Sequence, residues 1–209
     1  MNGLRRVHRG SAIVLALYAL VHLANHLAAL DGVASHIAFM DAVRGLTRVP
    51  AVEALLLACV LVQVGTGLAF LLRRRGGPMP PFLRMQAVSG AYLAFFLLVH
   101  VSSVLAGRFV FKLDTNFHYA AAGLHLAPFH FFFVPYYGLA VLALFVHLAG
   151  ALHLLVRGRV VAATRVRMGQ AGAVLGLVVA GLILAAFGGL LYPVVIPDAY
   201  LDNLRGFLP

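Results

Sequence analysis

Five long apolar segments constrain what this chain can fold into more than any other feature. A helix rises about 1.5 Å per residue, so roughly 20 apolar residues cross the ~30 Å hydrocarbon core of a bilayer. The five segments are continuously apolar, which excludes the alternating strands of an outer-membrane barrel. They lie at about 10–30, 51–72, 86–107, 135–156 and 169–191. The sequence predicts an all-α membrane protein with five transmembrane helices in one domain, residues 1–209.

The composition supports the same class. Of the 209 residues, 63% are hydrophobic and only 11% are charged, far from the balance of a soluble domain. The first apolar segment contains two histidines and an asparagine and lacks a small-residue cleavage site, so we expect it to stay in the mature chain rather than act as a signal peptide.

Charge predicts the orientation. The segments on the side of the N-terminus carry eleven arginines and no carboxylate, whereas the opposite side carries all six acidic residues and five cations. Because cytoplasmic loops are enriched in cations, we expect the N-terminus inside, the C-terminus outside, and a location in the inner (cytoplasmic) membrane. A basic face can also dock an acidic partner or anionic lipid. The eleven arginines are Arg5, Arg6, Arg9, Arg73, Arg74, Arg75, Arg84, Arg157, Arg159, Arg165 and Arg167.

An internal repeat relates the first four helices. Residues of the first helix recur in the third, 78 positions later, and the second helix matches the fourth at an offset of 84. The polar matches are Arg6 with Arg84, Ser11 with Ser89, His22 with His100, and Gln63 with His147. The repeat predicts two similar hairpins that form a four-helix bundle, with a fifth helix beside it.

Ionisable side chains inside apolar helices mark candidate functional positions. Counted along the helices, His22 and His100 lie at one depth in the outer half, and Gln63 and His147 at another in the inner half. A six-coordinate haem b requires one histidine from each of two facing helices at similar depth, which the first pair supplies. The alternative is that these histidines form hydrogen bonds between helices. Nearer the helix ends, we expect interfacial or supporting roles for His26 and His153.

These residues resemble those of a known family, the cytochrome b membrane-anchor subunits of succinate dehydrogenase and fumarate reductase. The similarity is to the single-chain, five-helix form with two haems and runs over almost the whole chain. The segments that carry it are Arg6-Val7-His8-Arg9-Gly10-Ser11 with His22-Leu23, then Arg84, Ser89-Gly90 and His100-Val101, and then Phe145-Val146-His147-Leu148.

The resemblance implies cofactors, partners and ligands. His22 and His100 would hold an outer haem and His147 one side of an inner haem, while Gln63 stands where the fourth histidine belongs. We therefore expect at least one haem b and an incomplete second site. The family's soluble partners are a flavoprotein and an iron–sulfur protein on the inside face, and its mobile substrate is a quinone.

The sequence thus predicts a haem-b-binding membrane anchor that transfers electrons between an iron–sulfur partner and quinone, without catalysis of its own on dicarboxylates. His36 and Glu53 are candidates for quinone protonation. One alternative is a stand-alone haem- or metal-binding membrane protein of the same fold, and another is a structural bundle whose histidines only bond helices together. The candidates for contacts to a haem propionate or a quinone carbonyl are Ser11, Arg84 and Ser89.

Overall fold

The computed structural model describes residues 2–73 and 77–208, so Arg74 and Arg75 of the predicted inner loop lie outside the described residues. Every regular element in this part of the chain is helical. Five of its helices are long and apolar enough to cross a membrane, which confirms the five predicted segments. These helices are α1 (Asn2–Ala28), α3 (Pro50–Leu72), α4 (Pro81–Phe109), α6 (His130–Leu155) and α7 (Ala162–Phe187).

The helix ends differ from the predicted boundaries for local reasons. Helix α1 starts at Asn2 instead of residue 10, because arginine is a good helix former whose charged end can reach beyond an apolar layer. Helices α3 and α4 each begin at a proline, Pro50 and Pro81, a residue suited to the first turn. Helix α7 stops at Phe187 instead of 191, because Gly189 adopts a φ of +77° just beyond it.

Short helices fill the segments between and after the long ones. The 3₁₀ turn η1 (Ala29–Asp31) follows α1, and Gly32 with φ +116° then reverses the chain into α2 (Val33–Thr47). This helix packs back against α1 and was not predicted. The remaining short helices are α5 (Phe117–His125) and α8 (Asp198–Arg205).

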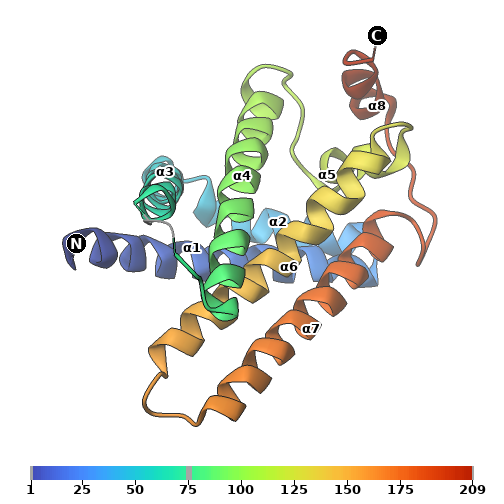
Figure 1. Cartoon of the computed structure of the whole chain (residues 1–209). Coiled ribbons are helices and arrows are strands. Elements are labelled where there is room, and N and C mark those ends of the chain that lie inside the picture. The colour runs from blue at the N-terminus through green and yellow to red at the C-terminus, as the bar shows by residue number, and fades with distance from the viewer. Residues whose placement is uncertain (1, 74–76, 209) are drawn as a thin grey trace.

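The long helices form a ring rather than a parallel bundle. Around the ring, α1 packs on α3, α3 on α4, α4 on α6 and α6 on α7, and α7 closes it against α1 and η1. In the described part of the chain, α1 and α4 do not pack against each other. Figure 1 views α3 nearly along its axis while α1 and α4 lie across the view, so these helices cross at steep angles. Such crossings keep contacts short and leave space inside the ring.

Two apolar clusters flank that space. The larger lies where the end of α7 meets η1 and α5, with Phe117 and Phe187 stacked at 4.4 Å between ring centres. The smaller joins α3 and α4 through Val60, Val64 and Ala94. Both clusters pack the rim of the ring, so the centre remains open to form the site described next.

Candidate functional site

A cavity of about 760 Å³ lies inside the helix ring. Its volume falls within the range of small-molecule and cofactor sites, roughly 300–1,000 Å³. All five long helices contribute to its lining, which is mainly apolar with a few polar groups at defined positions. Arg5 and Arg9 of α1 line it as well. Three groups of polar side chains among the described residues are named here: the His22–His100 level, the Gln63–His147 level and the arginine mouth.

At the His22–His100 level, two imidazoles approach each other from helices whose backbones do not pack together. The ring centres of His22 on α1 and His100 on α4 are 6.1 Å apart, with an angle of 65° between the ring planes. His100 stacks on Phe96 at 4.9 Å, and His22 stacks on Tyr18 at 5.7 Å. Each ring is therefore held from the side by an aromatic neighbour while it projects into the cavity.

Three further residues join His22, and the sequence reading did not bring them together. Nε2 of His22 lies 3.1 Å from Nε2 of His26, and Nδ1 of His26 lies 3.3 Å from Nε2 of His36. The Asn25 amide nitrogen donates to that same nitrogen of His36 at 3.1 Å. His36 is 2% exposed, and its burial lowers its pKa to about 4, so the ring is neutral at pH 7. A chain of hydrogen-bonded groups thus runs from α2 to the cavity.

At the Gln63–His147 level, each side chain bonds within its own hairpin. Gln63 on α3 donates to the His8 carbonyl at 2.5 Å and to Ser11 Oγ at 2.7 Å. His147 on α6 makes the corresponding contacts to α4. Its Nδ1 lies 3.1 Å from the Gln86 carbonyl and 3.4 Å from Ser89 Oγ.

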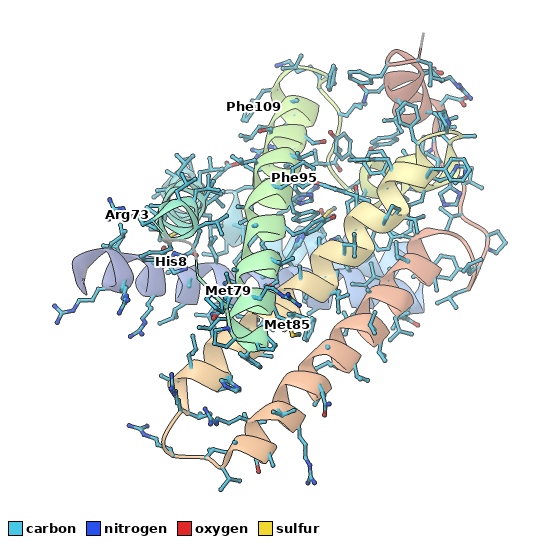
Figure 2. All side chains as sticks on the ribbon, in the orientation of Figure 1. His8, Arg73, Met79, Met85, Phe95 and Phe109 are labelled. Atoms are coloured by element: carbon cyan, nitrogen blue, oxygen red, sulfur yellow. The ribbon has the colours of Figure 1, made fainter. Side chains whose placement is uncertain are left out.

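These contacts express the sequence repeat in three dimensions. The two carbonyls, of His8 and Gln86, are 78 positions apart, as are the two serines. His8 lies where α1 passes α3 (Figure 2). Its Nδ1 contacts the Thr66 hydroxyl at 2.7 Å. The repeated polar residues therefore lock α1 to α3 and α4 to α6.

The two sets of hydrogen bonds differ in the nitrogen atoms that remain free to bind a ligand. The contact of His147 Nδ1 with a carbonyl leaves Nε2 available, as in many metal-binding histidines. The amide of Gln63 supplies no comparable nitrogen lone pair. Gly90 also packs tightly here, since a Cβ at its position would lie 2.8 Å from Cε1 of His147. In this arrangement the Gln63–His147 level holds helices together and offers one imidazole, not two.

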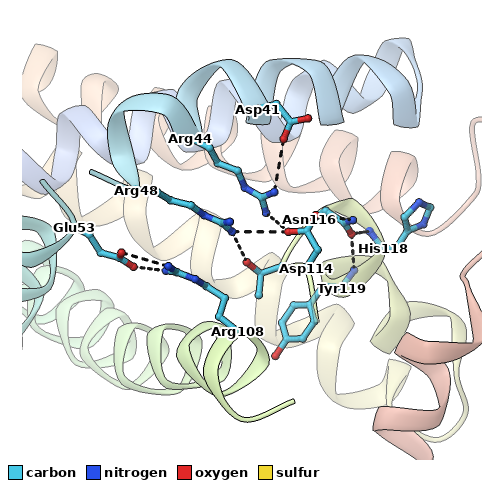
Figure 3. A network of polar contacts seen from close by, with 10 residues as sticks. Asp41, Arg44, Arg48, Glu53, Arg108, Asp114, Asn116, His118 and Tyr119 are labelled. Atoms are coloured by element: carbon cyan, nitrogen blue, oxygen red, sulfur yellow. Dashed lines mark hydrogen bonds and ion pairs between the residues drawn. The ribbon is translucent and has the colours of Figure 1, made fainter. Parts of the chain in front are cut away.

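The arginine mouth lies where the end of α2 comes close to the end of α4. Arg44, Arg48 and Arg108 line the cavity there, in the network of Figure 3. Arg108 on α4 makes a two-pronged ion pair with Glu53 on α3. Arg44 pairs with Asp114 at 2.8 Å.

Arg48 is the least committed of the three arginines. It donates to the Thr115 hydroxyl at 3.2 Å and lies 3.9 Å from Asp114. A guanidinium has five N–H groups, so Arg48 keeps donors for an anionic group at the edge of the cavity. The charge pattern of the sequence placed the three arginines only on the outer side of the membrane.

The other predicted site residues divide into two groups. His36 and Glu53 line the cavity, the first in the histidine chain and the second paired with Arg108. Ser11 and Ser89 are engaged by Gln63 and His147 and are not part of the lining, while Arg84 is exposed on α4. The structure does not bring these three to the cavity.

The chemistry open to the site follows from its donors. Two imidazoles that bind one metal from opposite sides, each at about 2.0–2.1 Å, hold their ring centres roughly 6 Å apart. The His22 and His100 rings meet that spacing. Among residues 2–73 and 77–208, no group of three or more His, Cys, Asp or Glu side chains is arranged to bind a bare metal ion. Comparison with protein-family models, curated proteins and solved structures finds no match to this chain.

Proposed function

We propose that this chain is a membrane protein that binds haem b between His22 and His100 and transfers electrons to or from a quinone. The observation that carries the proposal is the pair of imidazoles 6.1 Å apart across a cavity of about 760 Å³. The cavity residues fit a haem, because they provide two imidazole nitrogens as iron ligands, a mainly apolar lining, and arginines nearby.

Each part of the cavity has a role in this proposal. His22 and His100 would hold the haem iron, and their stacking on Phe96 and Tyr18 would keep the two imidazole rings from turning away. The spare donors of Arg48 at the mouth suit a carboxylate on the edge of the macrocycle. A haem bound there would supply one-electron transfer chemistry. The apolar lining excludes water from this centre.

In the form suggested by the family resemblance, the electrons come from or go to a flavoprotein and an iron–sulfur subunit on the N-terminal side. The carboxylate-free arginine loops on that side would favour such docking. The orientation with the N-terminus inside the cell, and the inner membrane as location, belong to this proposal.

A second candidate is a stand-alone haem protein of the same fold, without dehydrogenase partners. The observation that favours it is the Gln63–His147 level, where one imidazole is missing and both side chains bond within their hairpins. Affinity purification of the tagged chain from mild detergent separates the candidates. An anchor subunit would bring down a flavoprotein and an iron–sulfur protein, and a stand-alone protein would not.

The proposal of haem binding is tested on the purified chain by its dithionite-reduced absorption spectrum and a pyridine haemochrome count. We expect a low-spin spectrum and a haem content nearer one per chain than two. A protein without a Soret band after haem supplementation would refute the proposal.

A further inference from the structure

We infer that His26 is a second iron ligand on α1, interchangeable with His22, and that Asn25 and His36 select which of the two faces His100. This inference rests on the proposed haem site and concerns residues that neither the repeat nor the family resemblance marks as ligands. It arises from the hydrogen-bond chain Asn25–His36–His26–His22.

At the end of the chain nearest His100, a nitrogen lone pair becomes available to iron only when the hydrogen bond between His22 and His26 opens. Nε2 of His22 and Nε2 of His26 lie 3.1 Å apart. A hydrogen bond between two neutral imidazoles requires a proton on one nitrogen and a lone pair on the other. Only one of these two nitrogens can therefore bind iron in a given arrangement, and the other ring must turn aside when it does.

The other end of the chain decides which nitrogen that is. An amide nitrogen only donates, so Nε2 of His36 carries a lone pair and no proton. The proton between this nitrogen and Nδ1 of His26 must then belong to His26, and the two donors share the one lone pair of His36. With its proton on Nδ1, His26 carries its lone pair on Nε2, and His22 carries the proton.

Turning the Asn25 amide over reverses this order. Its Oδ1, which is buried and has no hydrogen-bond partner in the described part of the chain, would then accept from Nε2 of His36. Nδ1 of His26 then shares this single proton of His36 as an acceptor, so Nε2 of His26 carries the proton and His22 carries the lone pair. The two amide orientations thus select the two histidines in turn.

His26 is placed and supported as a ligand. Its ring centre is 4.4 Å from that of His22, so removal of the His22 ring opens space toward His100. It stacks on His36 at 5.5 Å and meets the edge of Phe187 at 5.1 Å. A partner on the second ring nitrogen is the usual support for a metal-binding histidine, and His36 supplies it.

The experiment uses the full-length chain purified in detergent as wild type, His22→Ala, His26→Ala and the double variant. His130→Ala is the matched control, because His130 packs against the tilted ring of Phe131 and does not line the cavity. Haem per chain, the reduced spectrum and carbon monoxide binding are measured.

Each single variant should keep a six-coordinate low-spin haem that does not bind carbon monoxide. The double variant should lose at least about tenfold in haem affinity, because losing both candidate ligands on α1 should cost at least as much as losing a residue that only supports a ligand.

A second comparison tests the role of His36. In the His22→Ala background, where His26 must bind iron, His36→Ala should weaken haem affinity by about 10–100-fold. In the His26→Ala background, His36→Ala should change haem affinity little. A merely structural role for His36 would affect both backgrounds alike.

The outcomes distinguish this inference from the proposal on which it rests. Suppose that the wild type shows low-spin haem but His22→Ala loses it as fully as the double variant does. If His22→Gln, which retains more of the side-chain volume, also loses it, His26 is not a ligand. That result leaves the proposed function intact. A wild-type protein that takes up no haem overturns both.

Discussion

The two polar levels of the cavity contain equivalent residues of a repeat but use them differently. At the His22–His100 level, side chains reach across open space between α1 and α4, which do not pack together. At the Gln63–His147 level, side chains turn back to a carbonyl and a serine on the helix beside them. A polar residue in an apolar helix bonds a neighbouring helix when one is close. Where none is close, His100 projects into the cavity and His22 bonds only His26 of its own helix.

The strongest test of this contrast removes one imidazole from each level. His100→Ala should lower haem affinity by more than about tenfold, because α4 offers no second histidine near the pair and an axial ligand matters more than an outer partner. His147→Ala should leave the low-spin spectrum unchanged, since its ring contacts Gln86 and Ser89 in the other half of the cavity. Both are read from haem content and the reduced spectrum.

The opposite result for the two variants would assign the haem to the other level of the cavity. If His147→Ala removed the low-spin signal while His100→Ala kept it, the cofactor would belong to the Gln63–His147 level. A wild-type content of two low-spin haems, both indifferent to His147→Ala, would show that the second site lies elsewhere.

A gain-of-function change sharpens the comparison further. Gln63→His should raise the haem content from nearer one to nearer two per chain. The new ring can place Nδ1 against the His8 carbonyl and Ser11, as His147 does against Gln86 and Ser89, which directs Nε2 away from the backbone. The measurement is haem per chain and the appearance of a second low-spin component. An unchanged haem content, with the variant folded, would contradict it.

The positions of the long helices were predictable, because each depends on one segment of the sequence alone. Long apolar segments must form helices in a membrane, because the backbone has no other partners there. The depth argument for His22 and His100 assumed parallel helices, yet the pair meets because α1 and α4 project their rings into the same space. Steep crossing angles depend on how side chains of different helices interlock, and one sequence does not reveal that.

The site was predictable only in part for a related reason. His22, His100, Gln63 and His147 stood out because they are polar in apolar segments and match in the repeat. The approach of His36 to His26 depends on a single conformation at Gly32, which folds α2 onto α1. A Leu-Asp-Gly turn signal at residues 30–32 was the only trace of it in the sequence.

A smaller effect is expected from Gly90→Ala. Its Cβ would come within 2.8 Å of Cε1 and 3.2 Å of Nδ1 of His147, so the ring must shift or the helices separate. We expect a destabilisation of about 1–3 kcal/mol, as for overpacking in a core, with the haem spectrum unchanged. Gly65→Ala on α3 is the matched control, because a Cβ there meets nothing within 4 Å. Thermal unfolding in detergent measures both, and equal effects would contradict the assignment.

The smallest effect compares the two serines of the repeat. Ser11→Ala removes the acceptor at 2.7 Å from the Gln63 amide, which keeps only the His8 carbonyl and is left with a free N–H. Ser89→Ala removes a contact at 3.4 Å from Nδ1 of His147, whose closer partner at 3.1 Å, the Gln86 carbonyl, remains. Since a hydrogen bond between membrane helices contributes about 0.6 kcal/mol on average, Ser11→Ala should cost roughly that or more, and Ser89→Ala should cost less. Thermal unfolding of the two variants in the same detergent gives the order. A larger loss from Ser89→Ala would mean that the lock between α4 and α6 depends on the serine rather than on the carbonyl.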